Sequence, residues 1–318
     1  MQNTTKLSVI ITARNDNYGG NLINRINTFI KVLAYLVKKY NIPSELIVVD
    51  YNPPQNKGML SSELSIDKEN EFLSFRFIEV PASFHNKCSG SDKMPMLEFL
   101  AKNIGIRRAY GDHILAVNPD IILSEELIEW FSKAKLDTNT YYRANRYDIT
   151  DNYFSPRFSV QEILKRARSH VFMIFLNNKT QYCSWFAWVK RVLISRSKKS
   201  FLMCPIFNKK TDGTDEKIIH ERAAGDFLLM HRSLWEKAGA YDEEPISGFI
   251  DGYILYILYC LGVKQTILLY PIYHINHIVG RAGRPEIETS VYRKTVEKML
   301  SERTPYKQIP TKWGAPDE

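Results

Sequence analysis

The sequence predicts an α/β chain in which a mostly parallel, doubly wound sheet is flanked by helices. Residues 7–12 and 45–50 are apolar and β-branched without alternation, which is typical of strands buried on both faces. Between them, apolar residues recur at helical spacing from Leu22 to Lys39, and Pro43 ends the pattern. A strand, a helix and a strand within roughly forty residues imply a right-handed crossover and a parallel pair.

The unit recurs in looser form, so residues 1–136 are predicted to be one α/β half. Its further elements are a strand over 72–80, a helix over 92–109, a strand over 113–117 and a helix from Ser124. Residues 137–223 are basic, aromatic and irregular beyond a strand over 141–147. Residues 224–286 regain regular structure, and residues 287–318 form a charged helix and a tail. The expected elements of this second half are an ordered segment over 224–230, short strands over 266–270 and 272–275, and helices from Ser233, over 249–261 and near 287–302.

The composition of the 318 residues is that of a globular protein, with 44% hydrophobic and 25% charged residues. The net charge of +8 favours anionic partners such as phosphorylated small molecules or acidic lipid headgroups. Nucleic acid is not expected, because no nucleic-acid-binding motif accompanies the charge. The four cysteines form no Cys-x-x-Cys pair, the first residues do not form a signal peptide, and no apolar run approaches the ~20 residues of a membrane span. We therefore expect a cytoplasmic protein.

Residues 160–204 leave two interpretations open. With Trp185, Trp188 and Phe201 among many basic residues, they could form an amphipathic surface that contacts an anionic membrane or a lipid-linked acceptor. The alternative is an acceptor-side insertion with an ordinary solvated basic face.

Acidic side chains end two of the predicted parallel strands, where ligands of doubly wound sheets bind. Asp120 could hold Mg²⁺ or Mn²⁺, or it could be a turn acid that caps the next helix. Asp50 could accept hydrogen bonds from a base or a ribose, or be a turn residue. His274 and His277, three residues apart after a strand, could add a nitrogen ligand to the metal or be structural.

Two further carboxylates belong to the second half. Asp226 follows Gly225, and Asp251 begins a strongly apolar helix, where it could act as an N-cap or as a base. A phosphate-cradling P-loop, a Gly-x-Gly-x-x-Gly fingerprint and a His-Glu-x-x-His motif are all absent from the sequence. Kinases, dinucleotide dehydrogenases and zinc hydrolases therefore have no support from motifs.

Five segments in order resemble the GT-A-fold glycosyltransferases of the family 2 type. The resemblance spans about residues 6–130 and 220–280. The segments are residues 7–16, which are similar to the first strand and nucleotide loop; 45–50; the Asn-x-Gly helix of 103–112; Asn118-Pro119-Asp120, at the place of Asp-x-Asp; and 224–251, which resemble the acceptor-side segment.

The resemblance implies an NDP-sugar site, a metal and a base. Asp120 and His277 would hold Mn²⁺ or Mg²⁺, Asp251 would be the base, and Asp226 would lie near the sugar or the acceptor. Asn118 departs from the family, because it replaces the first acid of Asp-x-Asp. The residues implied at the nucleotide sugar are Thr12, Arg14, Asn15, Asp50, Asp92, Asn103, Arg107 and Asn118.

The implied activity is hexosyl transfer from an NDP-sugar to the hydroxyl of a glycan or lipid-linked acceptor. It would invert the anomeric centre and serve surface polysaccharide or glycolipid assembly. A sugar nucleotidyltransferase shares the fold, but residues 10–20 lack its glycine-rich loop. A non-catalytic carbohydrate-binding or scaffold protein is the third possibility, and Asn118 is its one supporting feature.

Overall fold

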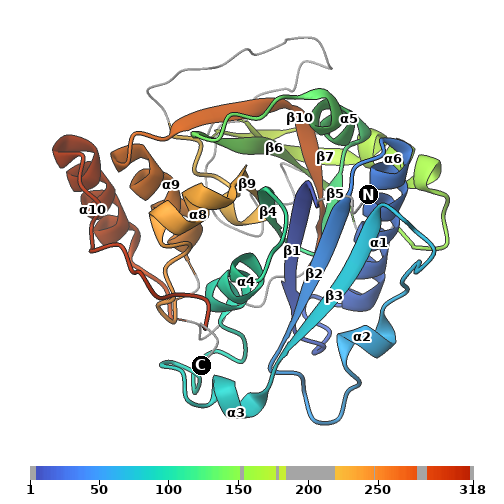
Figure 1. The fold of residues 1–318 in the computed structure, drawn as a ribbon, viewed down its shortest axis with the longest axis horizontal. Helices are drawn as coiled ribbons and strands as arrows, with labels where there is room; N and C mark the ends of the chain where they lie inside the picture. The colour runs from blue at the N-terminus through green and yellow to red at the C-terminus, as the bar shows by residue number, and fades with distance from the viewer. Residues whose placement is uncertain are drawn as a thin grey trace.

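The computed structural model describes residues 5–150, 154–176, 179–183, 219–246, 248–277 and 285–315. A mixed sheet of ten strands lies at its centre with helices on both faces, as Figure 1 shows. The predicted α/β fold class is therefore confirmed. The strands are β1 (Leu7–Ala13), β2 (Ser44–Tyr51), β3 (Leu73–Val80), β4 (His113–Val117), β5 (Ile121–Leu123), β6 (Thr140–Thr150), β7 (Val171–Leu176), β8 (Lys179–Tyr182), β9 (Phe227–His231) and β10 (Lys264–Asn276).

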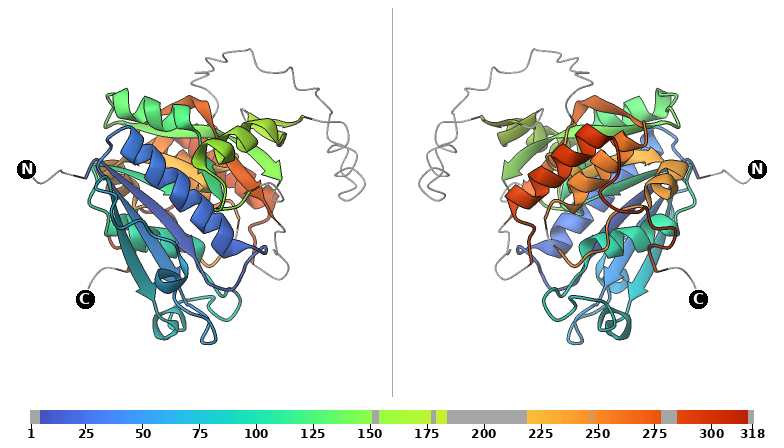
Figure 2. Two further views of the ribbon diagram at one scale, coloured as in Figure 1. Left: turned by 90° about the vertical axis from the view of Figure 1, so that its right-hand side faces the viewer. Right: turned by 90° about the vertical axis from the view of Figure 1, so that its left-hand side faces the viewer.

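The helices cover the sheet in two layers, each with its own apolar cluster. One layer holds α1, α5 and α6; the other holds α4, α8, α9 and α10, and Figure 2 views the two sides in turn. In β1, Val9 faces the first cluster and Ile10 the second, as alternation along a strand requires. The helices are α1 (Leu22–Lys39), α2 (Leu60–Glu63), α3 (Ala82–His85), α4 (Glu98–Arg107), α5 (Glu125–Lys133), α6 (Val160–Ser169), the 3₁₀ turn η2 (Ala224–Asp226), α8 (Arg232–Ala238), α9 (Ile250–Cys260) and α10 (Thr289–Glu302).

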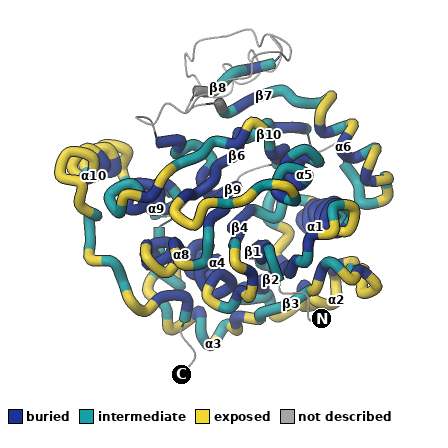
Figure 3. The backbone as a smooth tube through the Cα atoms, turned by 45° about the horizontal axis from the view of Figure 1, so that its top comes forward, coloured by how far each residue is buried: buried dark blue, intermediate teal, exposed yellow. Residues whose placement is uncertain are grey.

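The first half of the sheet is parallel, in the order β3-β2-β1-β4. Every residue of β1 and β2 is buried, which agrees with their unbroken apolar sequence. Figure 3 shows the difference in burial between elements: the central strands are buried (dark blue), whereas much of α10 is exposed (yellow). The carboxyl ends of β1, β2 and β4 therefore open on one edge of the sheet.

The second half mixes directions. β9 runs antiparallel to both β4 and β6, whereas β10 is parallel to β6 and antiparallel to β5. The prediction of two short strands at 266–270 and 272–275 is wrong, because β10 is one strand of 13 residues. Its register shifts between Leu268 and Ile272, and Pro271 lies in that irregularity, where its missing N–H is tolerated.

Two other predictions need correction. The helix expected over 92–109 begins only at Glu98 and ends at Arg107, because Pro95 disfavours helical backbone just before it. The irregular segment contains α6, β7 and β8, which we did not predict; Ser159 caps α6 by accepting a hydrogen bond from the backbone N–H of Glu162. About half of the proposed amphipathic surface, including Trp185, Trp188 and Phe201, lies outside the described residues. Among the described helices, none combines the length and the apolar content of a membrane span.

Candidate functional site

A pocket of about 260 Å³ opens at the carboxyl ends of β1 and β4 and at the end of β10. This is the edge at which doubly wound sheets bind ligands. Its walls come from the loop after β1, the start of α1, the segment before α4, the turn after β4, η2 and β10. The polar and charged side chains that line it are those of Thr12, Arg14, Asp16, Tyr18, Arg25, Glu98, Asn118, Asp120, Arg146, Asp226, His274 and His277.

A cluster of three potential metal ligands forms one end of this pocket. Nε2 of His277 lies 2.8 Å from Oδ2 of Asp120, and Nε2 of His274 lies 3.6 Å from the same oxygen. The antiparallel pairing of β5 with β10 places His274 opposite Ile121, and the backbone N–H of Ile275 donates to the carbonyl of Asp120. Sheet pairing therefore brings the three side chains together.

The donor set fits a divalent cation. One ligand atom from each of Asp120, His274 and His277 lies within 4.8 Å of the others. Oδ1 of Asp120 is buried and has no hydrogen-bond partner among the described residues, so it is available to a cation. Two imidazoles with one carboxylate suit a transition ion such as Mn²⁺ better than Mg²⁺, which prefers oxygen ligands. Three protein ligands leave positions for phosphate oxygens.

Electrostatics in the cluster favour an ionised Asp120. Burial opposes ionisation, but the charges of His274 and His277 and their hydrogen bonds outweigh it and hold the pKa of Asp120 well below its usual range. Burial and the charge of Arg146 lower the pKa of His274, yet Asp120 and Asp148 more than compensate and raise it to about 9. The cluster therefore gathers positive charge around one carboxylate, and a bound cation would replace the imidazole protons.

A second layer of charges orients the first. β6 pairs with β10 so that Asp148 lies opposite His274, and Oδ1 of Asp148 is 3.3 Å from Nδ1 of His274. Arg146, two residues away on the same face of β6, donates from Nε to Asp148 at 2.6 Å and from Nη1 to Oδ2 of Asp226 at 2.7 Å. A carboxylate behind a ligating histidine fixes the ring, so Asp148 would orient His274.

Asn118, which stands at the position of the missing acid, uses both ends of its amide. Its Nδ2 donates to Oδ1 of Asp226 at 2.7 Å, and its Oδ1 accepts from Nζ of Lys102 at 2.7 Å. A carboxylate could accept from Lys102 but could not donate to Asp226. The amide at position 118 is therefore the chemically matched group for these two neighbours.

Six of the residues implied at the site line this one pocket, namely Thr12, Arg14, Asn118, Asp120, Asp226 and His277. Four others lie apart from it. Asn15 donates to the carbonyl of Gly58, and the amide of Asn103 bonds the backbone of Tyr241. Asp92 is exposed in the turn before α4, and Arg107 belongs to another cavity.

Asp50 is buried at the end of β2 and does not line the pocket that Asp120 lines. Its Oδ2 accepts from the backbone N–H of Leu60 at 2.7 Å, so the start of α2 covers it. Burial raises its pKa, although that hydrogen bond acts in the opposite direction. The pairing of Asp50 with Asp120 across one cleft is not present.

Asp251 lines a separate cavity of about 450 Å³ between η2, α9 and α10. Its Oδ2 accepts from the backbone N–H of Gly225 at 2.8 Å, and burial raises its pKa despite that bond. Two non-glycine residues in the left-handed region, Ala223 at φ 55° and Phe249 at φ 66°, border the cavity. The Gly225 peptide separates this cavity from Asp226, so the two predicted catalytic acids face opposite sides of one backbone segment.

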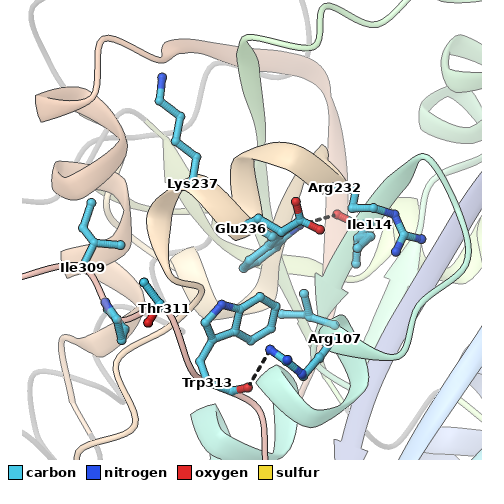
Figure 4. A pocket seen from close by; sticks show the side chains of 11 residues that line it. Arg107, Ile114, Arg232, Glu236, Lys237, Ile309, Thr311 and Trp313 are labelled. Atoms are coloured by element: carbon cyan, nitrogen blue, oxygen red, sulfur yellow. Dashed lines mark hydrogen bonds between the residues drawn. The ribbon is translucent and has the colours of Figure 1, made fainter. Parts of the chain in front are cut away.

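Another cavity, about 730 Å³, is lined by residues of α4, β4, α8 and the segment after α10, and is drawn in Figure 4. Its cations bond backbone carbonyls: Arg107 donates to Trp313, Arg232 to Ala109 and Gly111, and Lys237 to Leu261. In Figure 4 the charged ends of these three side chains point away from one another. Their contacts tie chain segments together and do not converge on a ligand.

Sequence reasoning missed several side chains in or around the pocket, among them those of Arg25, Glu98, Lys102, Arg146 and Asp148. Arg146 and Asp148 did leave a signal, because two opposite charges two residues apart near the end of an apolar strand lie on the same face. Lys102 left none, since a lysine in a helix is ordinarily solvated.

No protein-family model and no curated protein matches the sequence. Three of the solved structures that the chain resembles are GalNAc-T7 with UDP, GalNAc and Mn²⁺ (14% identity, TM-score 0.49, covering 96% of this chain and 53% of that chain), S. aureus TarS 1-349 (12%, 0.45, 85% and 60%), and the mannosyltransferase PcManGT from Pyrobaculum calidifontis with GDP-Man and Mn²⁺ (12%, 0.43, 96% and 66%). The chain thus spans about half to two thirds of their lengths. At TM-scores below 0.5 these similarities carry no further argument.

Proposed function

We propose that this chain is a metal-dependent glycosyltransferase that moves a sugar from a nucleoside-diphosphate sugar to a hydroxyl acceptor. The observation that carries the proposal is the cluster of Asp120, His274 and His277 in a pocket at the carboxyl ends of parallel strands. A metal held there would face the open volume of the pocket, about 260 Å³, which Arg14 and Arg25 also line.

Asp120, His274 and His277 would hold the metal, and Asp148 would orient His274 from behind. When bound, a divalent cation offsets the negative charge that develops on the leaving diphosphate. Arg14 and Arg25 line the same pocket, where Arg14 pairs with Asp16 at 3.0 Å and Arg25 donates to the backbone carbonyl of Tyr18 at 2.6 Å. Each would share its guanidinium group between that partner and the phosphates. Thr12, from the end of β1, lines the pocket with them and would contact the donor nucleotide.

The acceptor side is assigned to the cavity of Asp251. A base must be unprotonated and still attract a proton, and burial shifts the pKa of Asp251 upward, toward that condition. Asp226 is paired with Arg146 at 2.7 Å, which suits a positioning role near the transferred sugar better than proton transfer. Inversion of the anomeric centre is part of the proposal because the family resemblance implies it; the cavity of Asp251 is separate from the donor pocket.

The cellular setting that we propose is surface polysaccharide or glycolipid assembly at the cytoplasmic face of a membrane. The net charge of +8 supports peripheral contact with anionic lipid. Co-sedimentation of the chain with anionic vesicles at low salt tests this part separately. Failure to bind would remove the membrane contact and leave the transfer reaction untouched.

The proposal is tested with UDP, GDP and CDP and with their sugars, each with and without Mn²⁺. We expect one nucleotide to bind in a Mn²⁺-dependent manner in isothermal titration calorimetry, and its sugar to be transferred or slowly hydrolysed with release of the nucleoside diphosphate. Release of pyrophosphate from a nucleoside triphosphate and a sugar phosphate would identify a nucleotidyltransferase instead. Tight binding of an NDP-sugar without turnover would indicate a binding protein.

A further inference from the structure

Lys102 is a fully buried lysine in α4 whose ammonium group joins three segments of the chain beside the donor pocket. It donates to Oε1 of Glu98 at 2.9 Å, to Oδ1 of Asn118 at 2.7 Å and to the carbonyl of Gly225 at 2.9 Å. An ammonium group has three N–H donors, so this set of acceptors uses all of them. The position of the charge is therefore fixed in three directions.

The two partners outside α4 belong to the segments that carry the site. Asn118 lies two residues before Asp120, and Gly225 directly precedes Asp226. The amide of Asn118 also donates to Asp226, which closes a ring of contacts from Lys102 through Asn118 and Asp226 back to Gly225. Because Lys102 touches both segments, it sets their separation.

Gly225 is held through both of its backbone groups. Its carbonyl accepts from Lys102, and its N–H donates to Oδ2 of Asp251 at 2.8 Å. A Cβ at position 225 would lie 3.3 Å from that oxygen, so the approach of Asp251 is close. The backbone of one residue, Gly225, therefore connects the buried ammonium group to Asp251 and to the adjacent Asp226.

Burial of an ammonium group is costly unless polar partners compensate it. The only carboxylate that Lys102 contacts within the described chain is that of Glu98, which lies on the pocket wall. An apolar residue could fill this place in α4 without any such requirement. Lys102 itself does not line the donor pocket, so its charge is not explained by contact with a ligand.

We infer that Lys102 is a positioning residue for the transfer reaction. It holds Asn118 and the Gly225 peptide so that Asp226 and Asp251 keep their places relative to the metal cluster. The inference rests on the proposed function, since it names what the lysine positions. It predicts an effect on turnover and little effect on the metal, because Lys102 contacts none of Asp120, His274 and His277.

The test compares Lys102→Met with the wild-type chain and with Lys133→Met, a surface lysine in a similar i,i+4 pair with Glu129. Mn²⁺ alone, titrated by electron paramagnetic resonance, is expected to bind Lys102→Met within about threefold of wild type. With the NDP-sugar that the binding screen identifies as the donor, kcat is expected to fall at least about tenfold, and KM for the donor is expected to change less. Lys133→Met is expected to match wild type in all three quantities.

A double-mutant cycle separates positioning from general loss of structure. If Lys102 acts through Asn118, adding Asn118→Leu to Lys102→Met should lower kcat by less than Asn118→Leu does alone. Where Lys102→Met does not fold, Asn118→Leu carries the test, since it breaks the same link to Asp226.

Three outcomes are distinguishable. Retention of kcat within about twofold in a folded Lys102→Met, or in Asn118→Leu when it is the variant tested, overturns the inference. Fully additive losses in the cycle overturn it as well. If the wild-type chain itself shows no Mn²⁺-dependent nucleotide binding, the proposed function fails first.

Discussion

Restoring the acid of Asp-x-Asp with Asn118→Asp is expected to harm this protein. The amide of Asn118 donates to Oδ1 of Asp226 at 2.7 Å, and an aspartate cannot make that bond. A hydrogen bond to a charged group contributes about 1.5–3 kcal/mol. The new carboxylate would also lie against Asp226, at a repulsion of about 4 kcal/mol for charges some 4 Å apart at an effective dielectric of about 20.

Lys102 offsets most of that repulsion. Its Nζ already lies 2.7 Å from Oδ1 of Asn118, so a charge placed there gains an attraction of similar size. The net expectation is the lost hydrogen bond, a destabilisation of about 2 kcal/mol at neutral pH. Mn²⁺ binding should not improve, because the side chain at 118 points to Asp226 and Lys102 and not to the cluster.

The pH dependence gives the sign of the effect. Two carboxylates in one site share a proton, so the carboxylate introduced by N118D and that of Asp226 would form a pair with one pKa raised in the folded state. A raised acidic pKa stabilises the fold below it and removes that contribution as pH rises through it. The stability deficit of Asn118→Asp should therefore be larger at pH 8 than at pH 5.

Urea denaturation of both proteins at the two pH values measures this difference, and calorimetry measures Mn²⁺ affinity. A variant as stable as wild type at pH 8 that also binds Mn²⁺ more tightly would refute the reasoning. Such a result would show that a carboxylate at position 118 can bind the metal, as expected if Asn118 marks a transferase that has lost a metal ligand.

Four further predictions concern single side chains. Asp120→Asn should abolish Mn²⁺-dependent nucleotide binding as measured by calorimetry. His274→Gln should lower the affinity for Mn²⁺ about tenfold, and an affinity equal to that of wild type would exclude His274 as a ligand. Asp251→Asn should leave donor binding intact and lower kcat at least about a hundredfold, whereas unchanged kcat would place the base elsewhere. Burial lowers the pKa of His220 to about 3, so folding excludes a proton that the unfolded chain binds below about pH 6.5. The free energy of unfolding of the wild type should thus fall by about 2 kcal/mol relative to that of His220→Gln between pH 6.5 and 5. Urea denaturation measures both values, and a difference between the two proteins that does not change with pH would contradict this.

The sequence predicted the first half of the sheet well because burial on both faces leaves a direct pattern. β1 and β2 are apolar without a break, and their boundaries differ from the prediction by at most one residue at either end. The mixed second half could not be read in this way. Strand direction there depends on pairing between distant segments, as when β9 inserts antiparallel between β4 and β6.

The residues of the site likewise fall into those that local sequence can predict and those that depend on distant parts of the chain. A carboxylate at a strand end, such as Asp120, can be recognised locally, because parallel strands share an edge. Whether such a side chain reaches the cleft cannot be recognised from local sequence. Asp50 is the example, because α2 folds over it and its Oδ2 accepts a hydrogen bond from the backbone N–H of Leu60. Partners like Asp148 become evident only from the register of β6 against β10.

The pairing of the three-residue strand β5 with β10 has a consequence for how the chain assembles. Asp120 and His277 are 157 positions apart, and nothing local holds them together. The ligand set therefore does not exist until the last long strand has docked. A cation that binds only the docked state would shift the folding equilibrium by RT ln(1 + [M]/Kd), so the temperature of unfolding should rise with Mn²⁺ concentration even without any nucleotide.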